Sequence, residues 1–204
     1  MEEEHVYLAH PVIRRLKPRT DPLVLDVATG TGRLPLALCH HARFDGYVIG
    51  VDASRKMLDV AAHKIATEHF DDYVALVWHD AVALPFEDNA FDVVTSLEAL
   101  EFMPDPAAVL REICRVLRPG GLLLTTQRIN ARWFVNRLWD EPTLRRLLTE
   151  NQIEQIEFQA WQHDYNLVWG VKSGQSDYVG ARPVDEVLNP TALKRIVPLP
   201  QVED

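Results

Sequence analysis

The feature that most constrains the fold is an apolar run, Leu23–Val27, that leads straight into a turn of small residues. A second apolar run follows and ends in a lone acid, Asp52. A strand, a glycine-rich turn and a helix bring backbone N–H groups close to a nucleotide, and an acid at the next strand tip can accept both hydroxyls of a ribose. The pattern therefore indicates a site for an adenosine-containing cofactor.

The spacing of the small residues argues against a dinucleotide. The fingerprint G-x-G-x-x-G needs a last glycine that lets helix and strand pack closely. Here the small residues are Ala28, Gly30 and Gly32, and Leu34 stands where the last glycine is needed. Asp26 inside the turn would also face the negative charge of a pyrophosphate. It suits a ligand that carries an amino group and a positively charged sulfur.

Composition is consistent with an enzyme domain that has no nucleic-acid surface. The 204 residues carry a formal charge of −9, whereas phosphate binding needs a basic footprint. No stretch approaches the roughly 18 apolar residues of a membrane span, and the acidic start is unlike a secretory signal. Cys39 and Cys114 fall on apolar faces of expected helices. We interpret them as reduced thiols, which favours the cytoplasm.

Alternating strands and helices predict a parallel sheet covered on both faces. Strands are expected at Leu23–Val27, Tyr47–Val51, Val74–Trp78, Phe91–Ser96 and Leu122–Thr126, the last after a turn at Arg118–Gly121. Helices are expected at Gly32–His41 and after the capping residues Ser54 and Asp105. A further helix is expected to open at the Pro142-Thr143 pair. Ile153–Gln159 and Tyr165–Val171 read as a hairpin whose reversed strand forms the sheet edge. Glycines and prolines from Ser173 onward predict a partly ordered surface segment.

Several further motifs stand in a fixed order after the turn. They are Asp80-Ala81, Leu84-Pro85-Phe86 with Phe91-Asp92-Val93-Val94, Ser96–Pro106 and Arg115–Gly121. Together with Asp26–Gly32, read as acid-x-small-x-Gly-x-Gly, they resemble the motifs of class I S-adenosylmethionine-dependent methyltransferases. The resemblance runs from Leu23 to Thr126. Within that family, the motifs are similar to those of the small-molecule branch that includes the ubiquinone and menaquinone C-methyltransferases.

This resemblance implies a fold, a cofactor and a reaction. The fold would be an α/β seven-stranded Rossmann-like sheet of five parallel strands plus a C-terminal antiparallel hairpin, with helices on both faces. Residues 1–172 would form the domain with a short cap, residues 1–20, and residues 173–204 the tail. The cofactor would be S-adenosyl-L-methionine, with S-adenosyl-L-homocysteine as product. The partner would be a small-molecule acceptor methylated at nitrogen, oxygen or carbon by in-line displacement, and a homodimer is left open.

The resemblance also assigns roles to residues. Asp52 would accept the ribose hydroxyls, and Asp80 with the Ala81 N–H would hold adenine. Gly30 and Gly32 would let the backbone approach the methionine part. Asp26 would orient the cofactor amino group or act as an acid that caps backbone N–H groups, and Met57 would lie under adenine or in the core. The remaining expected contacts are Ala28, Thr29, Ala53, Ser96 and Leu97. Ala28 replaces a glycine, which is tolerable at a negative φ.

Alignment of nucleophile, methyl and sulfur would supply most of the acceleration. Candidate bases at the mouth are Glu98, Glu101 and His79, with His5 and His10 on the N-terminal segment, although loop acids are often simply exposed. The adjacent histidines His40 and His41 cannot converge on a metal from one helix face, so no metal is expected.

Substrate would be covered by Val6–Leu16 and Arg128–Trp139. In the latter, Trp133, Phe134 and Trp139 would form an apolar wall or pack on the sheet. Two other functions stay open. A non-catalytic S-adenosylmethionine-binding subunit or regulator would keep the cofactor residues without a substrate pocket. A nicotinamide-dependent oxidoreductase would need the absent third glycine and a Tyr-x-x-x-Lys pair, which the chain lacks.

Overall fold

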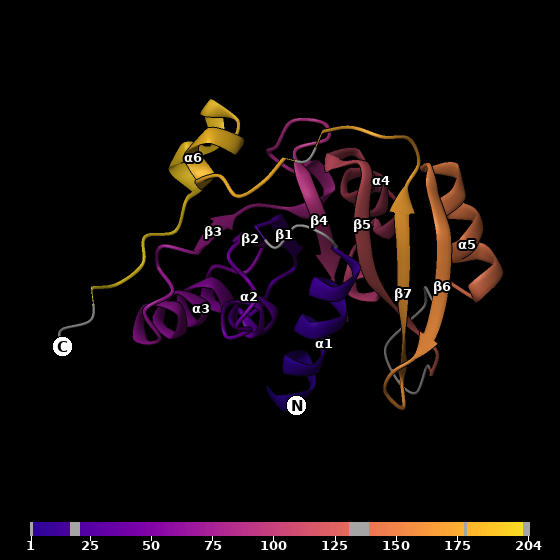
Figure 1. Cartoon of the computed structure of the whole chain (residues 1–204), viewed down its shortest axis with the longest axis horizontal. Helices are drawn as coiled ribbons and strands as arrows, with labels where there is room; N and C mark the ends of the chain where they lie inside the picture. The colour runs from indigo at the N-terminus through magenta and orange to yellow at the C-terminus, as the bar shows by residue number, and fades with distance from the viewer. Residues whose placement is uncertain (1, 17–20, 131–138, 178, 202–204) are drawn as a thin grey trace.

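One seven-stranded mixed sheet forms the centre of the molecule (Figure 1). The computed structural model describes residues 2–16, 21–130, 139–177 and 179–201, with the side chains of residues 2–8 outside the description. The strand order is β3-β2-β1-β4-β5-β7-β6. The strands are β1 (Leu23–Val27), β2 (Tyr47–Asp52), β3 (Val74–Trp78), β4 (Phe91–Ser96), β5 (Leu117–Arg128), β6 (Ile153–Ala160) and β7 (Tyr165–Lys172).

The parallel part of the sheet follows from its apolar runs. β1 and β4 are buried along their whole length, as strands covered on both faces must be. β1 pairs in parallel with β2 and β4, and β4 pairs in parallel with β5. The seven-stranded arrangement expected from the sequence is confirmed. The expectation of a reversed strand at the edge is wrong, because β7 is antiparallel to both neighbours and lies between β5 and β6.

β5 is longer than expected. The helix before it ends at Val116, and Leu117 already pairs with Phe91 of β4. The next paired residues are Val93 and Leu122, so a register shift absorbs the residues between. The expected turn at Arg118–Gly121 is therefore wrong, since this stretch is an irregular first part of the strand.

Helices cover both faces of the sheet (Figure 1). One apolar cluster joins the sheet to α1 (Glu2–Arg15), α2 (Arg33–Cys39) and α3 (Arg55–Thr67), and the other joins it to α4 (Pro106–Val116) and α5 (Glu141–Glu150). The expected caps are confirmed, because Ser54 accepts from the N–H of Met57 and Asp105 from that of Ala108. Short 3₁₀ turns are η1 (Ala81–Ala83), η2 (Leu100–Phe102) and η3 (Pro190–Arg195). None of the helices in the described residues has the length and apolarity needed to cross a membrane.

The segment after β7 packs against the sheet instead of lying on the surface. It contains α6 (Val184–Val187), and it forms isolated bridges from Leu188 to Phe86 and from Ile196 to Val77. Its buried apolar residues are Val184, Val187, Leu188, Ala192 and Val197. The surface segment expected from the glycines and prolines is thus wrong for these residues. The division of the chain at residue 172 stays a prediction.

A buried carboxylate joins this segment to the sheet. Asp92 on β4 is 0% exposed, and its Oδ2 accepts from the backbone N–H groups of Leu23 at 3.0 Å and Gly180 at 2.9 Å. Its Oδ1 accepts from Arg118 Nε at 2.6 Å and from the Val179 N–H at 2.9 Å. Asp92 therefore ties the start of β1 to the beginning of the C-terminal segment.

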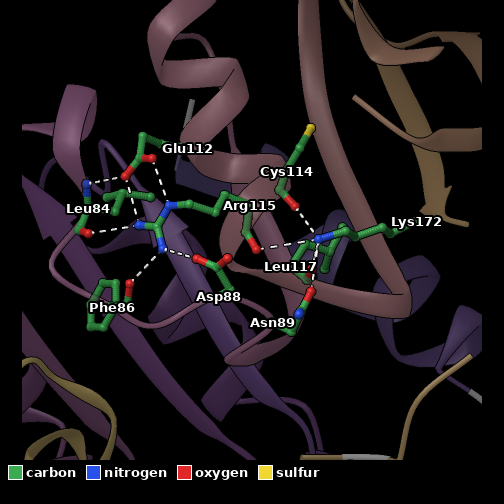
Figure 2. Close-up of polar contacts among 9 residues, drawn as sticks. All are labelled: Leu84, Phe86, Asp88, Asn89, Glu112, Cys114, Arg115, Leu117 and Lys172. Atoms are coloured by element: carbon green, nitrogen blue, oxygen red, sulfur yellow. Dashed lines mark hydrogen bonds and ion pairs between the residues drawn. The ribbon is translucent and has the colours of Figure 1, made fainter. Parts of the chain in front are cut away.

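Two cations hold the end of α4 (Figure 2). Arg115 donates to the carbonyls of Leu84 at 3.0 Å and Phe86 at 2.8 Å, and it pairs with Glu112. Lys172, at the end of β7, donates to the carbonyls of Cys114 at 2.8 Å and Leu117 at 2.7 Å. Burial lowers the pKa of the Lys172 ammonium. These contacts fix the loop after η1 and attach β7 to α4.

Candidate functional site

Two adjoining pockets open at the carboxyl ends of the parallel strands. The strand order reverses between β1 and β4, which is where open α/β sheets bind ligands. The larger pocket, about 690 Å³, is lined among others by Asp52, Ala53, Met57, His79, Asp80, Ala81, Phe102 and Met103. The smaller pocket, about 500 Å³, is lined among others by Asp26, Thr29, Thr31, Arg33, Leu34 and Leu97. Ala28, Gly30, Met57 and Glu98 border both pockets, so the two form one site.

The turn after β1 has an unusual backbone. Gly30 and Gly32 have φ angles of 57° and 75°, and a Cβ built on Gly30 would have no atom within 4 Å. Open space at this glycine leaves its backbone accessible to a ligand. Ala28 has a φ of 60°, so the condition of a negative φ, under which alanine would readily replace glycine here, is not met. A side chain in this region is strained, and such strain is often found at functional sites.

Asp52 is held in place at the end of β2. Its Oδ2 accepts from the Gly30 N–H at 2.8 Å, and its Oδ1 accepts from the Ser54 N–H at 2.7 Å. A carboxylate has about four acceptor positions, so each oxygen can accept a further hydrogen bond from a ligand. The carboxylate thus joins the glycine turn to the second strand and also lines the larger pocket.

Asp80, Ala81 and Met57 also line the larger pocket. Asp80 Oδ1 caps η1 by accepting from the Val82 N–H at 3.1 Å. Ala81 and Met57 line the same pocket, and Met57 is 46% exposed although it lies on α3. Exposure of this Met at a pocket wall argues against the alternative that it belongs to the core.

Asp26 and Thr29 give the smaller pocket its polar groups. Asp26 is 4% exposed, and its Oδ1 accepts from Thr95 Oγ1 at 2.7 Å. The buried Oγ1 of Thr29 has no hydrogen-bond partner within the described residues. Such a group has hydrogen-bonding capacity that a ligand can use.

Two residues expected at the site have other surroundings. Ser96 is 0% exposed inside β4, and neither pocket is lined by it. Gly32 is the N-cap of α2 and is likewise absent from both linings.

Glu98 and Glu101 lie in different environments. Glu98 has a φ of 51° and borders both pockets, and its Oε1 accepts from Gln162 Nε2 at 3.3 Å. The Glu101 side chain is only 5% exposed, lies 3.8 Å from Arg128 Nη1 and accepts the hydroxyl of Tyr165. The alternative that Glu101 is a simply exposed loop acid is therefore wrong.

Tyr165 is a neighbour of the site that the sequence did not reveal. Burial and the hydrogen bond to the Glu101 carboxylate raise the pKa of Tyr165, so its phenol keeps the proton. Phe102, 62% exposed beside the larger pocket, was also missed. The only sequence signal for these two residues was their position. Phe102 directly follows the candidate acid Glu101, and Tyr165 is the first residue of the strand after the hairpin loop.

Of the candidate histidines, one lies at the site and one lies away from it. His79 lines the larger pocket, whereas His10 lies on α1 with Nδ1 3.4 Å from His41 Nε2.

The expected N-terminal cover is α1. It packs mainly on α2, and its first residues lie toward the end of the sheet to which the β4 arrow points (Figure 1). No described α1 side chain lines either pocket. The described residues contain no group of three or more His, Cys, Asp or Glu placed to hold a metal.

The expected aromatic wall can be assessed only at its last residue. Trp133 and Phe134 lie outside the described residues, as does the His5 side chain. Trp139 packs partly buried against the core, and its carbonyl accepts from Gln127 Nε2 at 3.0 Å. This favours packing on the sheet for Trp139.

Comparison with known proteins gives one family and a consistent fold. The family described as "Methyltransferase domain" matches residues 25–125. A demethylmenaquinone methyltransferase of Lactobacillus johnsonii is 40% identical over 120 residues, which are 57% of this chain and 49% of that protein. The chain thus spans about half the length of the curated relatives it matches.

Solved structures show the same architecture. The crystal structure of the [4+2]-cyclase SpnF has a TM-score of 0.70 at 22% identity and covers 83% of this chain and 82% of that one. Haemonchus contortus Phospholethanolamine N-methyltransferase 2, in complex with phosphomonomethylethanolamine and S-adenosylhomocysteine, has a TM-score of 0.68 at 19% identity and covers 82% and 53%. At such identities the likeness shows the fold alone.

Proposed function

Since this chain belongs to the class I S-adenosylmethionine-dependent methyltransferases and is similar to the menaquinone-type enzymes, we propose that it transfers a methyl group from S-adenosylmethionine to a small-molecule acceptor. The observation that supports this most directly is the Asp52 carboxylate, which bonds the Gly30 N–H at 2.8 Å and faces a pocket wide enough for a nucleoside. A glycine turn joined in this way to an acid on the next strand suits an adenosyl group.

The two pockets divide the cofactor between them in this proposal. The larger one holds adenosine, with the ribose on Asp52 and the adenine beside Met57, Asp80 and Ala81. The smaller one holds the methionine part, with Asp26 and Thr29 toward its amino and carboxylate groups. The bound cofactor supplies an electrophilic methyl group on a positively charged sulfur. Ala28, Ala53 and Leu97 complete the walls.

Glu98 is the acid that we propose to face the acceptor. It borders both pockets and is therefore placed where the two halves of the cofactor would meet. A carboxylate there can orient an N–H or O–H acceptor and take its proton. Glu101 is engaged by Tyr165 and Arg128, and His79 lies beside Asp80 on the adenosine side, so both are weaker candidates.

The cofactor part of the proposal is tested by thermal shift. We expect S-adenosylmethionine and S-adenosylhomocysteine at 100 times their Kd to stabilise the protein by about 2.7 kcal/mol, and NAD and NADP to have no effect. A shift with NAD or NADP alone would support an oxidoreductase and contradict the proposal.

Turnover needs a separate measurement, because fold does not determine the reaction. One neighbour in fold is named as a [4+2]-cyclase. We expect S-adenosylhomocysteine to form when the protein is incubated with S-adenosylmethionine and fractionated small-molecule extracts, and not with Asp52→Ala. Tight cofactor binding without turnover in any fraction would favour a non-catalytic subunit or regulator.

Location and partners complete the proposal. A cytoplasmic location is supported by two free thiols, Cys39 and Cys114. The formal charge of −9 supports partners other than nucleic acid. The homodimer stays a further proposal, which light scattering of the purified protein would test.

A further inference from the structure

The C-terminal segment, residues 179–201, contacts both stretches of chain that flank one wall of the larger pocket. Before the wall, the Val197 N–H donates to the Leu76 carbonyl at 2.8 Å. After it, the Asn189 N–H donates to the Pro85 carbonyl at 2.9 Å. The pocket-lining residues 79–82 lie between these two points. One segment therefore holds the wall on both sides.

Trp78 extends this contact to two other lining residues of the larger pocket, Asp52 and Ala53. Its indole Nε1 donates to the carbonyl of Ala53 at 3.0 Å. The next N–H, that of His79, donates to the carbonyl of Asp52 at 3.2 Å. The end of β3 thus fixes the two carbonyls of the turn that carries the Asp52 carboxylate.

Arg195 covers the same indole from the C-terminal segment. Its guanidinium carbon lies 5.1 Å from the centroid of the Trp78 ring, within the range of a cation–π contact. The contacts form a continuous series from Arg195 through Trp78 to Ala53. Neither Arg195 nor Trp78 is among the residues that line the two pockets of the site, so any effect on a ligand there must pass through the backbone that they contact.

We propose that Trp78 and Arg195 are positioning residues through which the C-terminal segment keeps the larger pocket in its binding conformation. This inference rests on the proposed function, because its ligand is the adenosyl group. A pocket whose turn is already fixed loses less conformational freedom when the ligand binds. Coupling of this kind is reciprocal, so the ligand also stabilises the attachment of the segment.

The test uses single substitutions in the full chain and calorimetric titration with S-adenosylhomocysteine. Trp78→Phe keeps the aromatic ring and removes the indole N–H, and we expect the Kd to rise about three- to tenfold. Arg195→Met removes the charge and keeps an apolar stem, with an expected rise of about two- to fivefold. Arg195→Lys retains a cation and is expected to restore a Kd near that of the wild type.

Arg145→Met is the matched control. Arg145 lies on α5 with its guanidinium carbon 5.0 Å from the centroid of Phe158, on a different part of the sheet. It also donates to the Ile156 carbonyl at 3.0 Å and pairs with Glu141 at 2.7 Å, so its replacement removes at least as much as that of Arg195. The Arg145→Met substitution removes a cation–π contact that lies away from both pockets, and we expect an unchanged Kd for S-adenosylhomocysteine. A second measurement is hydrogen exchange at the Val197 N–H, which the wild type should protect more strongly when saturated with S-adenosylhomocysteine.

Three results would overturn the inference. The first is a Kd within twofold of the wild type for both Trp78→Phe and Arg195→Met. The second is an equal loss of affinity in Arg145→Met, which would show a general effect of stability. The third is a wild type that does not bind S-adenosylhomocysteine at millimolar concentration, which would also refute the proposed function. The first two leave that function intact.

Discussion

Replacing Asp52 by alanine is the most direct test of the site. The carboxylate accepts from the N–H groups of Gly30 and Ser54 at 2.8 and 2.7 Å, and the proposal adds two ribose hydroxyls. Hydrogen bonds to a charged group contribute about 1.5–3 kcal/mol each. Two such bonds would sum to about 3–6 kcal/mol, but contributions of bonds that share one carboxylate are not additive. We therefore expect Asp52→Ala to weaken cofactor binding by about 2–4 kcal/mol, on the order of 30- to several-hundred-fold in Kd.

Asp52→Asn refines the argument because it keeps one acceptor oxygen. Its amide nitrogen would face a backbone N–H that now bonds the carboxylate, so we expect an intermediate loss of about tenfold. Calorimetric titration with S-adenosylhomocysteine measures both variants, and their unfolding temperatures show that they remain folded. Asp59→Ala is the matched control, since Asp59 is an exposed acid on α3 paired with Arg55. A Kd for Asp52→Ala within threefold of the wild type would refute the reasoning.

Three further predictions concern stability. Ala28→Gly should raise the free energy of unfolding by about 0.5–1 kcal/mol, because its φ of 60° strains any side chain; a lower urea midpoint would contradict this. Asp92→Asn should lower it by about 3–5 kcal/mol, because the amide turns an acceptor of buried N–H groups into a donor, and urea denaturation showing a loss below 1 kcal/mol would exclude this account. Burial raises the pKa of the Cys114 thiol to about 12. Both states keep this proton well below the ordinary thiol pKa of about 8.5. Above that pKa and below about 12 only the unfolded thiol ionises, so the free energy of unfolding falls by up to about 1.4 kcal/mol per pH unit. Cys114→Ala should have a smaller slope between pH 9 and 10.5 in urea titrations, and an unchanged slope would contradict the assignment.

The parallel half of the fold was predictable because its signals are local. β1 and β4 are short runs rich in apolar residues, each interrupted by one acid, and this composition is typical of strands buried on both faces. Ser54 and Asp105 mark helix starts through their own side chains. The site follows from the same signals, since a glycine turn after one strand and an acid after the next meet at a single sheet edge.

The remaining features depend on contacts between distant residues. Glu101 and Tyr165 are 64 positions apart, and Asp92 accepts N–H groups from residues 69 and 88 positions away. Nothing in the local pattern distinguishes these acids from exposed ones. The apolar residues of the C-terminal segment have no helical or strand period, because they fill separate gaps along the sheet. The φ of Ala28 is set by the turn around it and has no sequence signal.

The C-terminal segment also affects how the molecule meets copies of itself. β3 is an outer strand, and its sequence Val74–Trp78 is uncharged and apolar throughout. Bare strands of this composition recruit one another into intermolecular sheets. The opposite outer strand, β6, carries Glu154 and Glu157 and an irregular register, which discourage such pairing. β3 has no charged residue that would discourage such pairing, and the backbone of residues 196 and 197 covers part of its edge instead. We therefore expect detachment of the C-terminal segment to cause aggregation before the sheet itself unfolds.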